Sequence, residues 1–530
     1  MSRRPILEDV GRPDDGVRIA ELVATLSYAA DLGLGQPMDH CLRQTVIALR
    51  LADLVGADPP QREATYYLGL MISAYCHADA AEQASWFGDD IAFKALGFEV
   101  LDMDTAQMVA FLLRRIASHG TGLERARRVA TLPVTARSRL SGFLTTHSTL
   151  GSQLAAGLGL APPVQVAIRQ AYEQWDGKGF PRGLRADDIC LAARLVPLAG
   201  AVEVHGRRHG PAAAAEAVRR HRGGEYDPVV VDAFCAHAEA VLAGLEEAAA
   251  WDAVLDLEPW PRTHVAGPRL DAALEAIGDS VDLKVPHLAG HSRGVARLAA
   301  EAARLWGFDE AGVTAVRRAG LVHDLGRLGV SNSVWDKPGP LTEAERERVR
   351  LHPYLTDRML SRVTALADAR VMAARHHERL DGSGYPHGLT AGSLSRGDRL
   401  LAAADSYHAM TEPRPYRTAV PERVAAERLL GEVRSGRLDA DAVNAVLRAA
   451  GHRAPALRTR PSGLTVREVE VLQLLARGHT TRQIAQQLKV TPKTASNHVE
   501  HIYAKLGVTS RASATLCAIQ HGLVGSFEPR

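Results

Sequence analysis

The residues with the clearest chemical potential lie between His287 and Arg417. Five histidines and two aspartates are spread over this stretch in short motifs, namely His291, His323 and Asp324, His352, His376 and His377, and Asp405. Imidazole and carboxylate groups are the ligands that iron and manganese accept in proteins. A single buried histidine is commonly an ordinary core residue, but seven such residues in one stretch indicate a metal centre.

The elements that must position these residues are helices. The segment 291–305 has apolar residues at Val295, Leu298, Ala302 and Leu305, so His291 opens the buried stripe of a helix and not its wet face. Buried histidines and aspartates need partners, because an unpaired polar group in a core is costly. A pair of metal ions supplies such partners to all of them at once.

The motifs in this stretch resemble the HD-GYP phosphodiesterases, which are metal-dependent hydrolases of cyclic di-GMP. "HD", "HP", "HHE", "DGSGYP", "AD" and "RPYR" follow one another in the family's order over about residues 267–450. The resemblance implies a first metal on His291, His323, Asp324 and Asp405, a second on His352, His376 and His377, and Asp324 as the bridge between them. Two-metal sites of this kind activate water and stabilise charge on a phosphodiester.

The same resemblance assigns the basic residues. Arg327 stands where the family usually has Lys; it keeps the positive charge and can fork onto phosphate, so with Asp324 it is a catalytic candidate and also binds substrate. Arg414 and Arg417 of "RPYR" are substrate-binding candidates, and the alternative is a solvated helix end. His287 stands where some members have a Glu that recruits a third metal, although Pro286 before it also fits a surface residue at a helix start.

Residues 17–245 resemble a degenerate repeat of the central domain that lacks most of its ligand residues. At an offset of 205, "WDGKGFPRGL" (175–184) matches "LDGSGYPHGL" (380–389), and His147 matches His352; at an offset of 251, His40 matches His291. The other ligand positions hold Ile72, Ser73, Ala171, Tyr172 and Gly200. We expect a structural or signal-receiving repeat without a binuclear centre; the alternative is a small-molecule site in the emptied cavity, lined in part by Tyr172 and Trp175. Residues about 246–268, with three prolines, are predicted to connect the repeats.

The C-terminal segment has the character of a DNA-binding module. In residues 461–530 eight Lys or Arg face four Asp or Glu, a net of +4, whereas the rest of the chain carries a net of −2. Apolar spacing predicts a short helix around Ile484 to Leu488, a turn at 490–493 and a second helix at 494–506, which is a helix-turn-helix pattern.

This segment resembles the LuxR-type four-helix DNA-binding domain from Leu464 to Arg511. The resemblance implies that the 494–506 helix enters the major groove, and it assigns contacts with bases or phosphates to Lys493, Thr494, Asn497 and His498 and with the DNA backbone to Lys505 and Arg511. Domains of this type bind DNA as dimers, so the 511–523 helix is a candidate homodimer surface. The alternative is a helical module that contacts only protein.

Composition places the chain among globular proteins of the cytoplasm. It has 530 residues, 46% of them hydrophobic and 23% charged, with five scattered cysteines that fit reduced thiols. There is no secretory h-region and no apolar run long enough to span a membrane. A capping box at Thr342 and Glu345 predicts a helix that carries His352 toward its far end.

The sequence therefore predicts an all-α protein of three parts. They are a degenerate HD-type repeat (1–250), an HD-GYP phosphohydrolase domain (265–452) with two divalent metal ions, iron or manganese, and a LuxR-type helix-turn-helix domain (461–530). The first hypothesis is a transcriptional regulator that hydrolyses cyclic di-GMP or a related phosphodiester. The second is a non-catalytic sensor, in which nucleotide or metal occupancy controls DNA binding.

Overall fold

The computed structural model describes residues 16–98, 122–245, 250–415, 417–452, 464–520 and 523. These residues are largely helical, which confirms the expected fold class, and contacts divide the chain into two compact units, Met1–Asp439 and Ala440–Arg530. Among the described residues, no helix combines the length and the apolar character needed to cross a bilayer.

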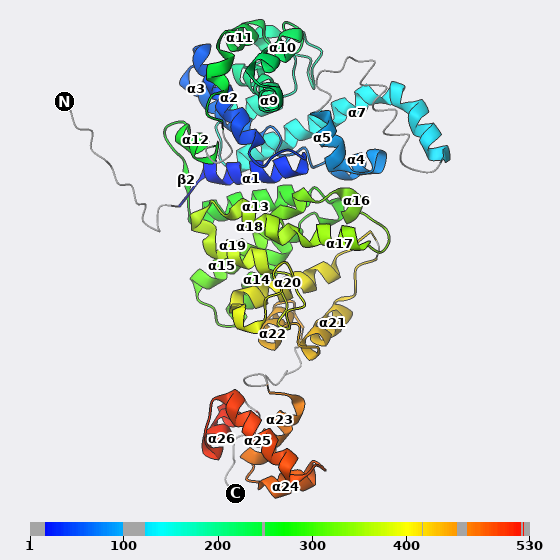
Figure 1. The fold of residues 1–530 in the computed structure, drawn as a ribbon, viewed down its shortest axis with the longest axis vertical. Helices are drawn as coiled ribbons and strands as arrows, with labels where there is room; N and C mark the ends of the chain where they lie inside the picture. The colour runs from blue at the N-terminus through cyan, green and yellow to red at the C-terminus, as the bar shows by residue number, and fades with distance from the viewer. Residues whose placement is uncertain are drawn as a thin grey trace, which may run out of the picture. The chain divides into compact units, whose positions relative to one another are not determined.

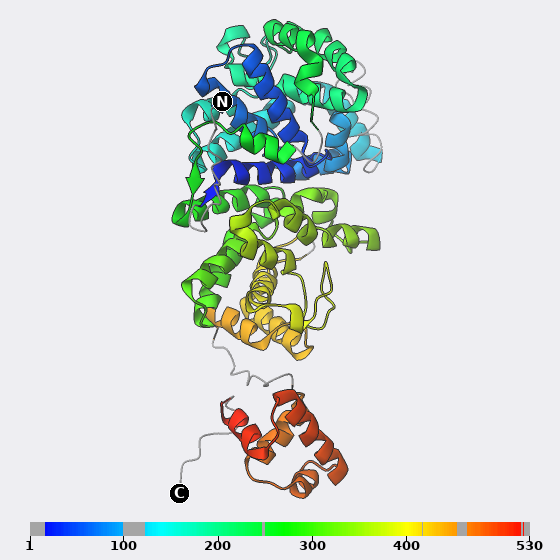
Figure 2. The same cartoon turned by 60° about the vertical axis from the view of Figure 1, so that its left-hand side comes forward.

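The first unit contains both repeats (Figures 1 and 2). The elements of the first repeat are β1 Val17–Arg18, α1 Ile19–Gly33, α2 His40–Leu54, α3 Pro59–Met71, α4 Ala80–Phe87, α5 Asp90–Gly97, α7 Gly122–Gly157, α8 Pro162–Arg169, η1 Ala186–Asp188, α9 Leu191–His209, α10 Pro211–Arg220, α11 Pro228–Leu242 and α12 Ala250–Asp256. Those of the second are β2 His264–Val265, α13 Gly267–Asp282, η3 Pro286–Leu288, α14 His291–Leu305, α15 Glu310–Val322, η4 Leu325–Gly329, α16 Asn332–Trp335, α17 Glu343–Arg350, α18 His352–Leu360, η5 Thr364–Leu366, α19 Ala367–Arg375, η6 Ala391–Ser393, α20 Arg396–Thr411 and α21 Glu422–Arg434.

Helix boundaries show that the two repeats share one local design. α2 and α14 are both 15 residues long and start 251 residues apart, and α3 and α15 are both 13 residues long at the same offset. In the loops, Glu173 accepts hydrogen bonds from the backbone N–H groups of Arg182 and Leu184, and Glu378, 205 residues on, accepts them from His387 and Leu389. The first repeat has therefore kept the fold of the second.

The repeats pack directly on each other. β1 pairs with β2, with Val17 opposite Val265, and α1 contacts both η4 and α18 of the second repeat. A buried ion pair joins them as well, because Lys284 Nζ lies 3.2 Å from Asp90 Oδ2 and neither side chain is exposed. One continuous apolar core therefore reaches across both repeats.

One local expectation was wrong. The helix capped by Thr342 and Glu345 has its capping box, but it ends at Arg350, and His352 begins the next helix. Pro353 explains this break, because proline has no backbone N–H to continue the hydrogen bonds of the preceding helix and suits the first turn of a new one.

The connection expected over about 246–268 contains α12 and β2. Trp251, Val254 and Leu255 recur at helical spacing and are buried, and the ring centroid of Trp251 lies 5.4 Å from that of Tyr28 in α1. This apolar stripe packs α12 against α1 and α2 of the first repeat.

The second unit contains α22 Ala440–Ala449 and the predicted helix-turn-helix, formed by α23 Val466–Ala476, α24 Thr481–Gln487, α25 Pro492–Leu506 and α26 Arg511–Gln520. Three threonines cap the N-termini of α23, α24 and α25, namely Thr465, Thr480 and Thr491. Gly507 ends α25 in the left-handed conformation. The turn before α25 thus comes slightly earlier than expected. Of the helix predicted at 511–523, the part after Gln520 lies mostly outside the described residues.

Candidate metal centre and DNA-binding surface

Asp324 lies at the middle of the predicted ligands. It follows α15 and is 1% exposed. Its Oδ2 atom lies 3.0 Å from His323 Nε2 and 3.6 Å from His291 Nε2, whereas its Oδ1 atom lies 3.3 Å from His352 Nε2 and 3.8 Å from His376 Nε2. One carboxylate therefore faces two separate pairs of imidazoles, one pair on each oxygen.

The remaining two predicted ligands complete this arrangement. Asp405 of α20 places Oδ1 3.4 Å from His291 Nε2 and Oδ2 3.8 Å from His377 Nδ1. Among the described residues, three groups have ligand atoms close enough to hold an ion: His291 with His323 and Asp324, His352 with His376 and His377, and His291 with His408 and Glu412. All seven predicted residues lie close together, and Asp405 lies beside His291 and His377 without belonging to any of these groups.

Hydrogen bonds fix the direction of the imidazole rings. His323, His352 and His376 each place Nδ1 within 2.5–2.8 Å of the carbonyl oxygen three residues earlier, at Gly320, Val349 and Ala373. A ring that donates from Nδ1 keeps its Nε2 lone pair for a metal. Gly326 permits this packing, because a Cβ there would overlap the carbonyl oxygen of His352.

The electrostatics suit metal ligands at His352, His376 and Asp324, whereas Asp405 and Glu412 outweigh burial and raise the pKa of His291 to about 9. Burial lowers the pKa of His352 to about 4 and of His376 to about 3, so both rings are neutral near pH 7. Burial alone raises the pKa of Asp324, but Arg327 and His323 outweigh it and hold that pKa well below its usual range. The carboxylate is thus ionised.

Buried polar atoms at this centre lack hydrogen-bond partners. They are Nε2 of His291, Nε2 of His323 and Oδ1 of Asp324, whereas Oδ2 of Asp324 is ion-paired with Arg327. Buried polar groups in native proteins almost always have partners. Divalent cations on these atoms would satisfy all three, so the residues fit the two-ion centre that the motifs imply, and a mixed imidazole and carboxylate set suits iron or manganese.

The Arg327 side chain lies within the centre. Its guanidinium ion-pairs with Oδ2 of Asp324 and lies over the Trp335 ring, 5.2 Å from its centroid. The side chain is nearly buried, so its positive charge adjoins the same oxygen that faces His291 and His323. Any cation on that oxygen must share it with Arg327 or displace it.

The two other predicted substrate arginines have different surroundings. Arg417 donates to backbone carbonyls at the end of α20, among them Ala409 at 2.6 Å and Met410 at 2.9 Å. Arg414 lies nearer the centre, with Nη2 3.3 Å from Glu412 Oε2. Arg417 thus holds the loop together, and substrate contacts from either residue stay a prediction.

Sequence reasoning missed two residues beside His291. Glu412 Oε2 lies 2.8 Å from His291 Nδ1, and His408 Nδ1 lies 3.3 Å from Glu412 Oε1. The signal was present, because a His and a Glu four residues apart share one helix face. His287, the candidate for a third metal, lies 3.6 Å from Asp336, and burial together with Arg414 and Arg327 lowers its pKa to about 4.

The first repeat has replaced the centre with ion pairs. His40, at the position of His291, places Nδ1 2.6 Å from Glu203 Oε2, and Arg207 Nε lies 2.8 Å from Glu203 Oε1. His147, at the position of His352, has its Nε2 atom 3.2 Å from Asp79 Oδ1. Histidine and arginine side chains thus pair with buried carboxylates in the first repeat, at the place where the second repeat has its predicted metal ligands.

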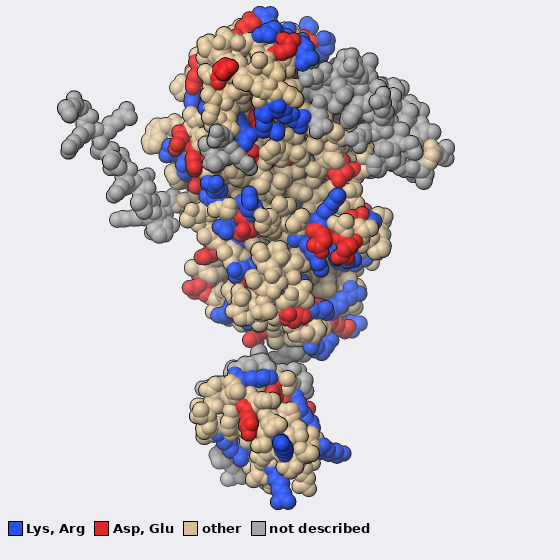
Figure 3. All heavy atoms as spheres, viewed as in Figure 1, with Lys and Arg blue, Asp and Glu red and all other residues tan. Residues whose placement is uncertain are grey.

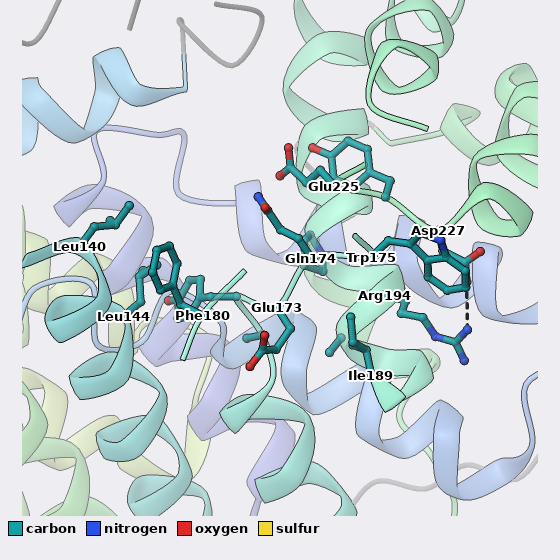
Figure 4. A pocket seen from close by; sticks show the side chains of 15 residues that line it. Leu140, Leu144, Glu173, Gln174, Trp175, Phe180, Ile189, Arg194, Glu225 and Asp227 are labelled. Atoms are coloured by element: carbon teal, nitrogen blue, oxygen red, sulfur yellow. Dashed lines mark hydrogen bonds and ion pairs between the residues drawn. The ribbon is translucent and has the colours of Figure 1, made fainter. Parts of the chain in front are cut away.

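A cavity of about 200 Å³ lies in the first repeat and is lined in part by Tyr172 and Trp175, the two residues named in the alternative of a small-molecule site. Figure 4 shows apolar side chains at one end, including Leu144 and Phe180, and polar ones at the other, including Arg194 and Asp227. The equivalent space in the second repeat is about 10 Å³, because it holds Arg375 and Asp398, 3.3 Å apart. Gln170 and Ala193 stand at those positions in the first repeat, so smaller side chains have opened the cavity.

The DNA-binding candidates fall into two groups. On α25, Lys493 and Asn497 are exposed and Thr494 and His498 are half-buried beside them, so one helix face presents all four. Figure 3 shows basic side chains spread over the visible surface of this domain with fewer acidic ones among them. This helix can enter a major groove.

Lys505 and Arg511 bind within the domain. Lys505 Nζ lies 2.7 Å from Glu468 Oε2, and Arg511 Nη2 donates to the carbonyl oxygens of Leu475 at 2.6 Å and His479 at 2.8 Å. These contacts hold α23 against α25 and α26. A DNA backbone contact from either residue stays a prediction.

Comparison with known proteins agrees with this geometry. The HD domain family model matches residues 134–230 and 275–442, and the model of the bacterial regulatory proteins of the luxR family matches residues 462–518. The 3'3'-cGAMP-specific phosphodiesterase 3 of Vibrio cholerae is 30% identical over 410 residues, which cover 76% of this chain and 88% of that protein.

Two further relatives support the assignment. A cyclic di-GMP phosphodiesterase of Thermotoga maritima is 37% identical over 133 residues, 25% of this chain and 36% of that protein. The crystal structure of the V. cholerae cyclic GMP-AMP specific phosphodiesterase V-cGAP3 covers 83% of this chain and 99% of its own, with a TM-score of 0.57 and 26% identity.

The fold and the site thus define a class: the chain belongs to the HD-domain family related to the HD-GYP phosphodiesterases of cyclic dinucleotides. Within that class it is a protein that joins such a domain to a C-terminal LuxR-family helix-turn-helix domain.

Proposed function

We propose that the second repeat is a metal-dependent phosphodiesterase that hydrolyses a cyclic dinucleotide, and that its state controls DNA binding by the LuxR-family domain. The observation that carries the proposal is Asp324, whose two oxygens face separate pairs of imidazole Nε2 atoms. Two ions bridged by one carboxylate are the arrangement that activates water against a phosphodiester. Iron and manganese are the proposed ions.

The proposed substrates are cyclic di-GMP and 3'3'-cGAMP, the nucleotides for which the two relatives are named. Arg327 and Arg414 are the proposed phosphate contacts, because both lie beside the centre. Lys493, Thr494, Asn497 and His498 are the proposed DNA contacts. We further propose that the protein acts in the cytoplasm as a homodimer on DNA.

A second function has a specific observation in its favour. Arg327 already neutralises the bridging carboxylate, so the centre can persist without a full complement of metal. In that case the domain is a sensor, and nucleotide or metal occupancy changes the affinity for DNA without turnover. Such a ligand shifts the equilibrium only by its differential affinity for the two states.

One experiment separates the two functions. Full-length protein, purified without oxygen and loaded with Mn²⁺ or Fe²⁺, is incubated with cyclic di-GMP and with 3'3'-cGAMP beside the Asp324→Asn variant. Linear dinucleotide or mononucleotide formed only by the unsubstituted protein supports the enzyme. Absence of product from protein with bound metal refutes it, and a DNA titration with and without each nucleotide then tests the sensor.

A further inference from the structure

His291 differs from the other buried imidazoles of the centre in how its ring is held. His323, His352 and His376 use the carbonyl three residues earlier, which a preceding helical turn supplies. His291 is instead the first residue of α14 and follows Gly290, whose φ of 84° is left-handed. Its Nδ1 atom is paired with a side chain from another helix, Glu412 at 2.8 Å.

Glu412 is itself firmly placed. It is the residue that ends α20, and its side chain is 16% exposed. Its Oε1 atom lies 3.3 Å from His408 Nδ1, and its Oε2 atom lies 3.3 Å from Arg414 Nη2. Gly294 leaves room for this arrangement, since a Cβ there would overlap the His408 ring. The carboxylate is therefore fixed from several sides while it faces His291.

We propose that Glu412 is a positioning residue that accepts the Nδ1–H of His291 and so presents the Nε2 lone pair to the metal centre. His291 Nε2 lies 3.6 Å from Asp324 and 3.4 Å from Asp405, on the side where the first ion is proposed. An ionised acceptor fixes the tautomer and makes the ring a stronger ligand. This inference rests on the proposed metal-dependent function and adds a residue to its machinery.

The first repeat supplies a matched control. His40 begins α2 as His291 begins α14, and its Nδ1 atom lies 2.6 Å from Glu203 Oε2, with both side chains buried. The residues at the other ligand positions there include Ile72, Ser73 and Gly200, which offer no carboxylate or imidazole. The contact is the same, but it leads to no metal centre.

The test is equilibrium Mn²⁺ binding by full-length Glu412→Gln and Glu203→Gln beside the unsubstituted protein. Glutamine keeps the size and an acceptor oxygen but removes the charge. We expect Mn²⁺ affinity to fall by about 10–100-fold for Glu412→Gln, the usual effect of losing such a partner, and to stay unchanged for Glu203→Gln. Thermal unfolding without metal measures any purely structural effect, which both variants should share.

Several outcomes would overturn the inference. Equal Mn²⁺ affinity in Glu412→Gln and the unsubstituted protein would refute the positioning role and leave the proposed function standing. An equal loss in both variants would show a general effect of a buried charge. No Mn²⁺ binding by the unsubstituted protein, and none of Fe²⁺, would instead refute the proposed function and this inference together. Should Glu412→Gln not fold, Glu412→Asp, which keeps the charge but shortens the reach, must give a smaller loss in the same direction.

Discussion

Replacing Asp324 with asparagine tests the centre most directly, because it removes one charge and almost no volume. In metal-free protein the loss falls on Arg327, whose guanidinium ion-pairs with Asp324 and whose Nε and Nη1 atoms have no hydrogen-bond partner. Removing one partner of a buried ion pair costs about 3–5 kcal/mol. We therefore expect Asp324→Asn to lower the free energy of unfolding by about that amount before any metal is added.

Added metal should increase the difference in free energy of unfolding between Asp324→Asn and the unsubstituted protein. A ligand that binds only the folded state at 100 times its Kd adds about 2.7 kcal/mol. The unsubstituted protein should gain this on addition of Mn²⁺, and Asp324→Asn should not, because the shared ligand is gone. The two proteins should then differ by about 6–8 kcal/mol in saturating Mn²⁺.

Urea unfolding followed by tryptophan fluorescence is the appropriate assay. All six tryptophans lie before residue 440, so the signal reports on the first unit and leaves out the DNA-binding domain. An Asp324→Asn, Arg327→Met double variant is the control, since it removes both charges and should recover stability without recovering the Mn²⁺ response. Unchanged metal-free stability in Asp324→Asn, with the full Mn²⁺ gain retained, would refute the reasoning.

Three other predictions address separate parts of the molecule. Asn497→Ala should weaken DNA binding with unchanged Mn²⁺ affinity, and equal DNA affinity at several salt concentrations in a fluorescence-anisotropy titration would remove Asn497 from the interface. Asp90→Asn should lower the free energy of unfolding by about 3–5 kcal/mol, because it leaves Lys284 buried and unpaired. In urea unfolding, the double variant Asp90→Asn, Lys284→Met should recover most of this loss. No recovery would mean that the pair does not hold the repeats together. Because burial lowers the pKa of His352 to about 4 and of His376 to about 3, the unfolded chain binds more protons than the folded one from about pH 6.5 down to those values. Metal-free protein should therefore lose stability as the pH falls through this window, and a double substitution of these histidines by asparagine should flatten the slope measured at pH 7, 6 and 5; an unchanged slope would contradict their burial as neutral rings.

Much of the fold could be predicted because its signals are local. Helix α14 begins at His291 and ends at Leu305, as its apolar spacing indicated, and the capping box at Thr342 is present. Apolar periodicity and helix caps depend on residues within one or two helical turns, so they can be recognised from the sequence alone. The local signal that was misjudged, at Pro353, concerned a helix boundary and left the fold class unchanged.

The sequence by itself therefore determined the helical fold, the faded first repeat, the residue types of the metal centre and the presence of a helix-turn-helix. Only the tertiary structure decided how they are used. In the structure, each oxygen of Asp324 faces a different pair of imidazoles, and Glu412 contacts His291, which lies 121 residues earlier in the chain. Lys505 and Arg511 bind partners inside their own domain. Residue types and local periods are properties of the chain, whereas the direction of a side chain and the partner it meets depend on how distant helices pack.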